Sequence, residues 1–218
     1  MTRRFTLALR RAEKHLAAVD RPLARRILAL GRCELTPYWD RSPYESLVRA
    51  VAHQQLHGRA AEAILGRLVQ RYPDRNFPLP EDLLATSVDE LRGFGFSQAK
   101  VATIRGIAEG ALSGIVPSRA AAENLTDEEL IARLSALRGI GRWTVEMLLI
   151  FTLGRLDVMP IDDFGIRTGL QSIYRVKTKV TRDHFARYTD RWAPFRSIGA
   201  WYLWREADRA KLAARKPS

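Results

Sequence analysis

Apolar residues recur at spacings of three and four along almost the whole chain, while alternating apolar and polar residues are hard to find. A helix returns to the same face after about 3.6 residues and a strand after about two, so the pattern predicts an all-α protein. Proline after Ser42 and after Leu79 marks a first helical position, and Thr126 with Glu129 has the spacing of a capping box. We expect helices over residues 5–19, 21–30, 43–53, 58–72, 80–86, 87–93, 97–113, 126–137, 142–153, 162–173, 181–192 and 197–213.

The length and the single cysteine restrict the class of protein further. A chain of 218 residues suits one domain or two small lobes that share a spine. Cys33 alone excludes an internal disulfide, a thiolate zinc site and a four-cysteine iron–sulfur cluster, and it fits a reducing compartment. The longest apolar stretch, over residues 147–153, is far shorter than the ~20 residues of a membrane span, and the N-terminus has no signal-peptide core. We therefore expect a soluble protein that is not secreted and does not bind membranes.

The chain is strongly basic. It has 36 Lys and Arg residues against 24 Asp and Glu, which gives a formal charge of +12. Basic residues that are spread along a chain gain free energy by releasing counterions from a phosphate backbone. The charge thus favours nucleic acid as the partner, and a solvated basic surface is the alternative.

One short pattern occurs twice. Leu91-Arg-Gly93-Phe-Gly95 and Leu137-Arg-Gly139-Ile-Gly141 both precede an amphipathic helix, so each is a candidate helix–hairpin–helix motif. Glycines allow a tight reversal that points backbone N–H groups outward at the start of the next helix, where the helix dipole also favours an anion. Such a turn can hold a phosphate, and its carbonyl groups are candidates for binding a monovalent cation. The alternative is an ordinary tight turn between packed helices, which we expect for the first copy.

Two adjacent acids, Asp162 and Asp163, follow the second hairpin and its helix. Acids at the start of a helix satisfy free N–H groups and interact favourably with the dipole, so capping is one explanation. The other explanation is catalytic, and it requires one carboxylate to face a cleft.

Four motifs in order resemble the helix–hairpin–helix (HhH-GPD) DNA glycosylase superfamily of base-excision repair, in its AlkA-like 3-methyladenine DNA glycosylase II branch. The resemblance extends from about Leu47 to Trp204. The motifs are Val51-Ala-His-Gln-Gln-Leu56, Leu137-Arg-Gly-Ile-Gly-Arg-Trp-Thr144, Pro160-Ile-Asp-Asp163 and Arg191-Trp-Ala-Pro-Phe-Arg-Ser197.

The resemblance implies a compact all-α fold of two lobes with a DNA cleft between them. Residues 1–218 would form one glycosylase unit, with the helix–hairpin–helix at about residues 130–154 and the N-terminal helices packed on the C-terminal lobe. Only about forty residues precede the matching region, so we expect this fold without the N-terminal sheet domain of longer AlkA-like proteins.

Asp163 matches the catalytic aspartate of the family, which leaves Asp162 as a helix cap or structural neighbour. A carboxylate near C1′ stabilises the oxocarbenium-like centre, or orients the water that adds to it. Family members that also cut the strand use a lysine just after the hairpin, where this chain has Trp143. An indole cannot form a Schiff base, so we expect a monofunctional enzyme without lyase activity.

The resemblance also predicts how the damaged base is held. Trp143 and Trp204 match aromatic residues of the base pocket, and an indole face attracts a cationic base such as 3-methyladenine or 7-methylguanine. Met147 replaces a tyrosine that often lines this pocket, which leaves the range of lesions open. For three other tryptophans we expect core packing, namely Trp39, Trp192 and Trp201.

The loop after residue 53 matches the segment that enters the minor groove. Gln55 would fill the gap left by the flipped base, Leu56 would be a wedge or a buried neighbour, and His57 would contact the groove. Without the resemblance, helix capping and a solvated surface are the usual roles of a glutamine pair and a histidine at a helix end. The hairpin would bind the DNA backbone through a set of four residues, Gly139, Gly141, Arg142 and Thr144.

The resemblance therefore implies a monomeric DNA-3-methyladenine glycosylase II that flips alkylated purines out of double-stranded DNA and hydrolyses the N-glycosidic bond. No cofactor and no side-chain metal site are expected. We expect it in the cytoplasm with the nucleoid in a bacterium, or in the nucleus of a eukaryote. The competing hypothesis is a helix–hairpin–helix module that binds DNA or damaged sites without cleaving them.

Overall fold

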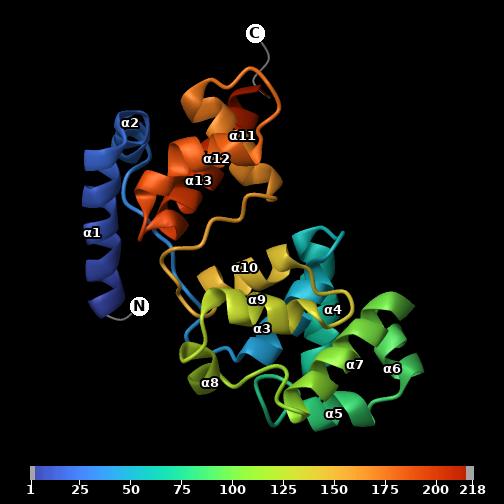
Figure 1. Ribbon diagram of the computed structural model, residues 1–218. Helices are drawn as coiled ribbons and strands as arrows, with labels where there is room; N and C mark the ends of the chain where they lie inside the picture. Colours follow the sequence, from blue (N-terminus) through green and yellow to red (C-terminus); the bar gives the residue numbers. More distant parts are fainter. Residues whose placement is uncertain (1–2, 215–218) are drawn as a thin grey trace. The chain divides into compact units, whose positions relative to one another are not determined.

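The computed structural model describes residues 3–214, which divide between two compact units (Figure 1). Unit 1 combines Met1–Pro37 with Gly154–Ser218, and unit 2 is Tyr38–Leu153. All regular secondary structure in residues 3–214 is helical, so the all-α prediction is confirmed. No helix within these residues has the length and apolar character needed to cross a membrane.

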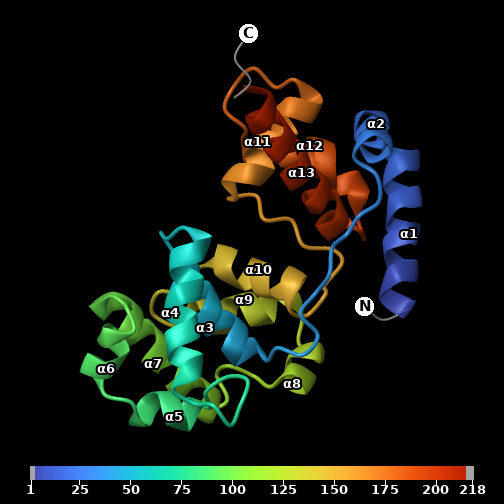
Figure 2. The same cartoon turned by 180° about the vertical axis from the view of Figure 1, so that it is seen from behind.

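Unit 1 joins the two ends of the chain. Its helices are α1 (Arg3–Val19), α2 (Arg21–Leu30), α11 (Phe164–Tyr174), α12 (Arg182–Thr189), the 3₁₀ helix η1 (Asp190–Trp192) and α13 (Arg196–Ala214). Helix α11 packs along α13, and the two N-terminal helices, α1 and α2, also pack against α13 (Figures 1 and 2). The apolar stripes of α11 and α13 are buried between them, which fixes the start of α11 beside α13.

The buried carboxylate of Asp20 links three parts of unit 1. Its Oδ1 accepts a hydrogen bond from the Leu23 N–H at 2.9 Å and so caps α2. Its Oδ2 accepts from the Tyr174 hydroxyl at 2.6 Å and from the Trp192 indole at 3.0 Å. Trp192 is fully buried, which confirms its predicted core role, whereas Trp39 and Trp201 are only half-buried.

Unit 2 is formed from the middle of the chain. Its helices are α3 (Pro43–His53), α4 (Gly58–Gln70), α5 (Pro80–Ala85), α6 (Val88–Gly93), α7 (Gln98–Leu112), α8 (Arg119–Glu123), α9 (Asp127–Ser135) and α10 (Arg142–Phe151). Helix α3 lies at the centre and packs against α4, α7 and α10 (Figure 2). The core between them contains fully buried Leu47, Val51, Ile104, Ile107 and Leu149.

The predicted helix starts are mostly confirmed, because their capping residues are visible in the sequence. Ser42 accepts a hydrogen bond from the Glu45 N–H at 3.1 Å, directly before the proline that starts α3. The capping box is also present, since Thr126 accepts from the Glu129 N–H at 3.2 Å and Glu129 accepts from the Thr126 N–H at 2.7 Å.

The structure differs from the prediction most at one helix end, at one helix start and at one helix that was not predicted. The helix expected over residues 181–192 ends at Thr189 and continues as η1. The helix expected to begin at Asp162 begins at Phe164, because Asp163 is its N-cap. Helix α8 was not predicted, since its five residues are too short to show a period, although Ser118 caps it.

Candidate active site

Asp163 lies where the chain enters α11, and two N–H groups hold one of its oxygens. Its Oδ1 accepts from the backbone N–H of Ile166 at 2.9 Å and from the indole N–H of Trp204, on α13, at 2.9 Å. A glycine at position 165 makes room for this contact, because a Cβ atom there would lie 2.9 Å from Trp204 Cδ1. The half-buried carboxylate of Asp163 is therefore fixed in orientation by two helices of unit 1, α11 and α13.

The two adjacent acids have different roles from those we expected. The capping role falls to Asp163, the candidate catalytic residue, and not to Asp162. Asp162 instead forms an ion pair with Arg167 at 2.8 Å, so only its role as a structural neighbour is confirmed. Helix capping and catalysis are not exclusive roles for one carboxylate, because a capping carboxylate keeps its negative charge.

The segment leading to Asp163 is fastened to the start of α13. Both carboxylate oxygens of Asp157 accept 2.8 Å hydrogen bonds from the Arg196 guanidinium, and Oδ1 also accepts from the Arg196 backbone N–H. Burial alone would raise the pKa of Asp157, but these hydrogen bonds outweigh it and hold the pKa below its ordinary value. The Ser197 hydroxyl accepts from the Val158 N–H at 2.9 Å and donates to the Arg155 carbonyl at 2.8 Å.

Sequence reasoning missed an aromatic residue beside this carboxylate. Phe164 is the first residue of α11, and 75% of it is exposed, which is unusual for a phenylalanine. The apolar residue directly after the paired acids was the available signal. Phe164 joins Trp204 as a candidate for stacking on a base.

In unit 2, the second glycine hairpin connects α9 to α10. Gly139 has φ +81°, and a Cβ atom there would lie 3.0 Å from the Thr103 methyl group on α7, so both conformation and space require glycine. Gly141 is the N-cap of α10, and no side chain caps this helix. Ile140, between the glycines, is buried. The start of α10 therefore presents backbone N–H groups of the kind that bind an anion.

The first glycine copy connects α6 to α7 and differs at this point. The Ser97 hydroxyl accepts a hydrogen bond from the Lys100 N–H at 3.3 Å and caps α7. A side chain thus occupies the place that an anion would take, in agreement with an ordinary turn. Lys100 Nζ donates to the Ala52 carbonyl at 2.8 Å, near the end of α3.

Arg142 and Thr144, which we expected to contact the DNA backbone, both have side chains that contact other residues of the protein. Arg142 donates to Glu128 at 2.8 Å and to Glu146 at 3.0 Å, and its hydrogen bonds hold the pKa of Glu128 below the ordinary value. A phosphate would have to compete with these carboxylates. Thr144 is buried, with 4% of it exposed, and its side chain lines a pocket. Phosphate contacts from these two side chains stay predictions.

The loop predicted to enter the minor groove is exposed and adjoins the hairpin. Gln54 Nε2 donates to the Gly139 carbonyl at 3.2 Å. Gln55 follows with φ +57°, a left-handed conformation that is uncommon for residues other than glycine. Gln55, Leu56 and His57 are all exposed, and His57 is the N-cap of α4 without a side-chain hydrogen bond to the helix. Leu56 is therefore not a buried neighbour.

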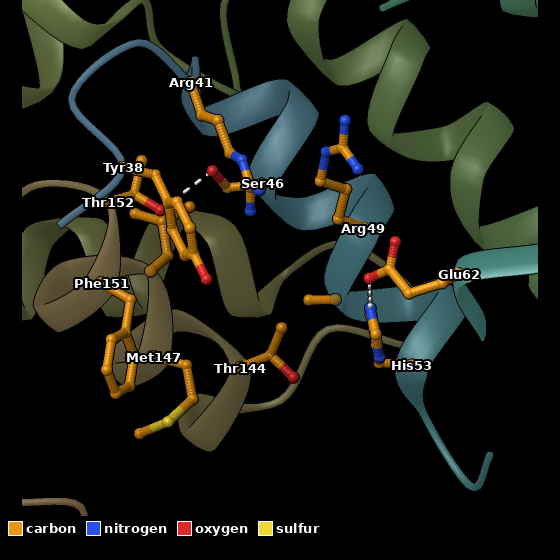
Figure 3. A pocket seen from close by; sticks show the side chains of 12 residues that line it. Tyr38, Arg41, Ser46, Arg49, His53, Glu62, Thr144, Met147, Phe151 and Thr152 are labelled. Carbon is orange, nitrogen blue, oxygen red and sulfur yellow. Dashed lines mark hydrogen bonds and ion pairs between the residues drawn. The ribbon is translucent and has the colours of Figure 1, made fainter. Parts of the chain in front are cut away.

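A pocket of about 410 Å³ lies between α3 and α10 (Figure 3). Met147 and Phe151 of α10 face Ser46, Arg49 and His53 of α3 across it. It is lined mainly by carbon, and at one side His53 Nε2 lies 3.0 Å from Glu62 Oε1. Met147, which stands where the resemblance predicts a tyrosine of the base pocket, lines this pocket between α3 and α10.

Trp143 lies on α10 beside this pocket without lining it. It is 44% exposed, so its ring is available for contact. The candidate base-binding residues are thus divided between the units: Trp143 is in unit 2, and Trp204 with Phe164 is in unit 1. Within residues 3–214, no group of three or more His, Cys, Asp or Glu side chains is arranged to hold a metal ion.

The chain belongs to the HhH-GPD superfamily of base excision DNA repair proteins, whose family model matches residues 48–194. It is 42% identical to DNA-3-methyladenine glycosylase 1 of Schizosaccharomyces pombe over 199 residues, which cover 91% of this chain and 87% of that protein. It is 37% identical to the alkylbase DNA glycosidase-like protein mag2 of the same organism over 196 residues, 89% of this chain and 92% of that protein.

Solved structures of similar proteins have the same fold. The S. pombe 3-methyladenine DNA glycosylase Mag1, in complex with abasic DNA, matches with a TM-score of 0.81 at 42% identity, over 95% of this chain and all of that one. The DNA-3-methyladenine glycosidase of Bacillus halodurans matches with a TM-score of 0.83 at 32% identity, over 94% of this chain and 91% of the other.

Proposed function

We propose that this protein is a monofunctional DNA glycosylase that removes alkylated purines, such as 3-methyladenine and 7-methylguanine, from double-stranded DNA. Membership of the base-excision superfamily and the names of its relatives support this activity. The observation that carries it is the carboxylate of Asp163, which is held by the Ile166 N–H and the Trp204 indole at the start of α11.

The chemistry requires a negative charge close to the sugar. As the bond between C1′ and the base nitrogen breaks, its electron pair leaves with the base and positive charge develops on the sugar. The Asp163 carboxylate stabilises that charge, and water then adds to C1′ and loses a proton. A cationic alkylated base departs as a neutral molecule, so the reaction needs little acid catalysis.

Aromatic side chains provide the recognition of the base: Trp143 and Phe164 are exposed, and Trp204 is half-buried. Trp143, Phe164 and Trp204 are available to stack on a flipped base, and an indole face attracts a cationic base by about 1–2 kcal/mol. The N–H groups at the start of α10 hold a backbone phosphate, and Gln55 fills the space that the base leaves.

Release of methylated bases from alkylated duplex DNA tests the proposal directly. The purified protein should release 3-methyladenine or 7-methylguanine and leave abasic sites, and Asp163→Asn should release almost none. A protein that binds abasic DNA tightly but releases no base from a panel of alkylated substrates would instead be a damage-binding module.

A further inference from the structure

The positive charge of the chain is divided very unequally between the two units. Unit 1 contains 23 Lys and Arg residues against 10 Asp and Glu, a net formal charge of +13. Unit 2 contains 13 against 14, a net charge of −1, although it carries the candidate hairpin and minor-groove loop. The long-range attraction to a polyanion therefore has to come from unit 1.

Three arginines of unit 1 line a cavity that has no acidic residue in its lining. It has a volume of about 360 Å³ and lies where α2 meets the C-terminal end of α11. We call it the arginine cavity, and its lining residues are Pro22, Arg25, Arg26, Ile173, Tyr174 and Arg175.

The two exposed arginines of this cavity are unpaired. In residues 3–214, neither Arg25 nor Arg175 has an acidic side chain as an ion-pair partner. Arg26 lies 3.6 Å from the buried Glu206, which Arg209 also contacts at 2.8 Å, so its charge is partly compensated. In unit 2, by contrast, Arg142 near the hairpin is paired with Glu128 and Glu146.

Unpaired guanidinium groups around a concave surface favour a phosphate, because each group donates several hydrogen bonds in a planar fork. The partner that presents phosphates to a base-excision protein is duplex DNA. We infer that the arginine cavity binds a backbone phosphate of duplex DNA and is a second DNA contact, separate from the hairpin. The choice of DNA as the source of the phosphate rests on the proposed function.

Neutral variants of Arg25 and Arg175 test this inference without disturbing Arg26 and its buried partner. Arg175 has φ +53° and ψ +39°, so asparagine, which tolerates this conformation well, is the suitable replacement. The test variant is therefore Arg25→Gln with Arg175→Asn. The matched control is Arg4→Gln with Arg11→Gln, which removes the same charge from exposed positions of α1 in the same unit.

The measurement is the affinity for an undamaged duplex at several KCl concentrations. Each phosphate contact contributes roughly 0.9 to the slope of log K against log salt, so the cavity variant should lower that slope by about 2. The ratio of wild-type affinity to that of the cavity variant should then fall about tenfold between about 50 and about 200 mM KCl. The control variant should keep a slope close to that of the wild type, and both should unfold at the wild-type temperature.

Equal loss of slope in both variants would show that only the net charge matters and would overturn the inference. An unchanged slope in the cavity variant would also overturn it, and if that variant alone lost binding of inorganic phosphate, the cavity would be a site for small anions. Because undamaged DNA is used, the result does not depend on base release. A protein that releases no base but shows the change in slope would contradict the proposed function alone.

Discussion

At the scale of single residues, Asp163 combines a structural and a chemical role that one substitution separates. Asparagine caps a helix about as well as aspartate, and its amide oxygen can still accept from the Trp204 indole, so Asp163→Asn should lower the unfolding free energy by no more than about 1.5 kcal/mol. It cannot supply a negative charge, and we expect excision to fall about 100-fold or more. Single-turnover release from methylated duplex and thermal unfolding measure the two effects, and near-normal excision would refute the assignment of Asp163.

Asp162→Asn is the matched control for that experiment. Asp162 is exposed and pairs with Arg167, and surface ion pairs contribute at most about 1 kcal/mol. Excision by this variant should stay close to that of the wild type.

Trp204 is expected to position the catalytic carboxylate through its indole N–H. Trp204→Phe keeps an aromatic ring but loses the 2.9 Å hydrogen bond to Asp163. Hydrogen bonds to charged groups contribute about 1.5–3 kcal/mol, so excision should fall roughly 10- to 100-fold, measured as single-turnover release. Trp201→Phe, a half-buried position three residues earlier, serves as the control and should leave the rate almost unchanged. Similar losses in both variants would mean that general packing, and not this bond, is responsible.

At the scale of structural elements, the sequence predicts those features that neighbouring residues determine, such as the helix starts. Ser42 and Thr126 mark helix starts because their hydroxyl groups satisfy the first free N–H groups, and the structure shows those bonds. The bond between Trp204 and Asp163 joins residues far apart in the chain, so no local pattern reveals it. The exposure of Phe164 likewise depends on how α11 packs against α13.

The exposed loop between α3 and α4 gives a prediction about lesion recognition. Gln55→Ala should weaken binding to a flipped-base or abasic-site analogue by about 1–3 kcal/mol, the scale of stacking lost per base. Binding to undamaged duplex should change little, because phosphates dominate it. His57→Ala should show a smaller loss of the same kind. Equal losses on both DNAs would indicate that the loop only contacts the backbone.

The segment before Asp163 gives a prediction about pH. The pKa of Asp157 is lowered in the folded protein, so its bonds to Arg196 stabilise the fold above the ordinary Asp pKa of about 3.9 and are lost as the pH falls through the lower folded value. Asp157→Asn should therefore unfold at a lower temperature than the wild type at pH 7. The difference should narrow below about pH 4, as measured by thermal unfolding across pH. If the difference in unfolding temperature between wild type and variant stayed constant across this pH range, ionisation of Asp157 would not be the cause of the destabilisation.

At the scale of the whole molecule, the division into two units explains what the sequence alone leaves hidden. Unit 1 is built from both ends of the chain, so its net charge of +13, from 23 basic against 10 acidic residues, is not apparent along the sequence. The family fold is shown by the match over residues 48–194. The predicted cleft between two lobes stays a prediction.

The intact enzyme should release the base without cutting the strand. Strand cleavage through a Schiff base needs an amine that attacks C1′, and the indole of Trp143, at the position where the resemblance predicts the lysine of strand-cutting members, cannot form one. The lysine that shares unit 2 with Trp143 is Lys100, which donates a hydrogen bond to the Ala52 carbonyl, and burial lowers its pKa. After complete excision, the product strand should stay intact until alkali is added, and borohydride should trap no covalent complex. A trapped adduct would refute the monofunctional assignment, and its loss in Lys100→Ala would identify the amine.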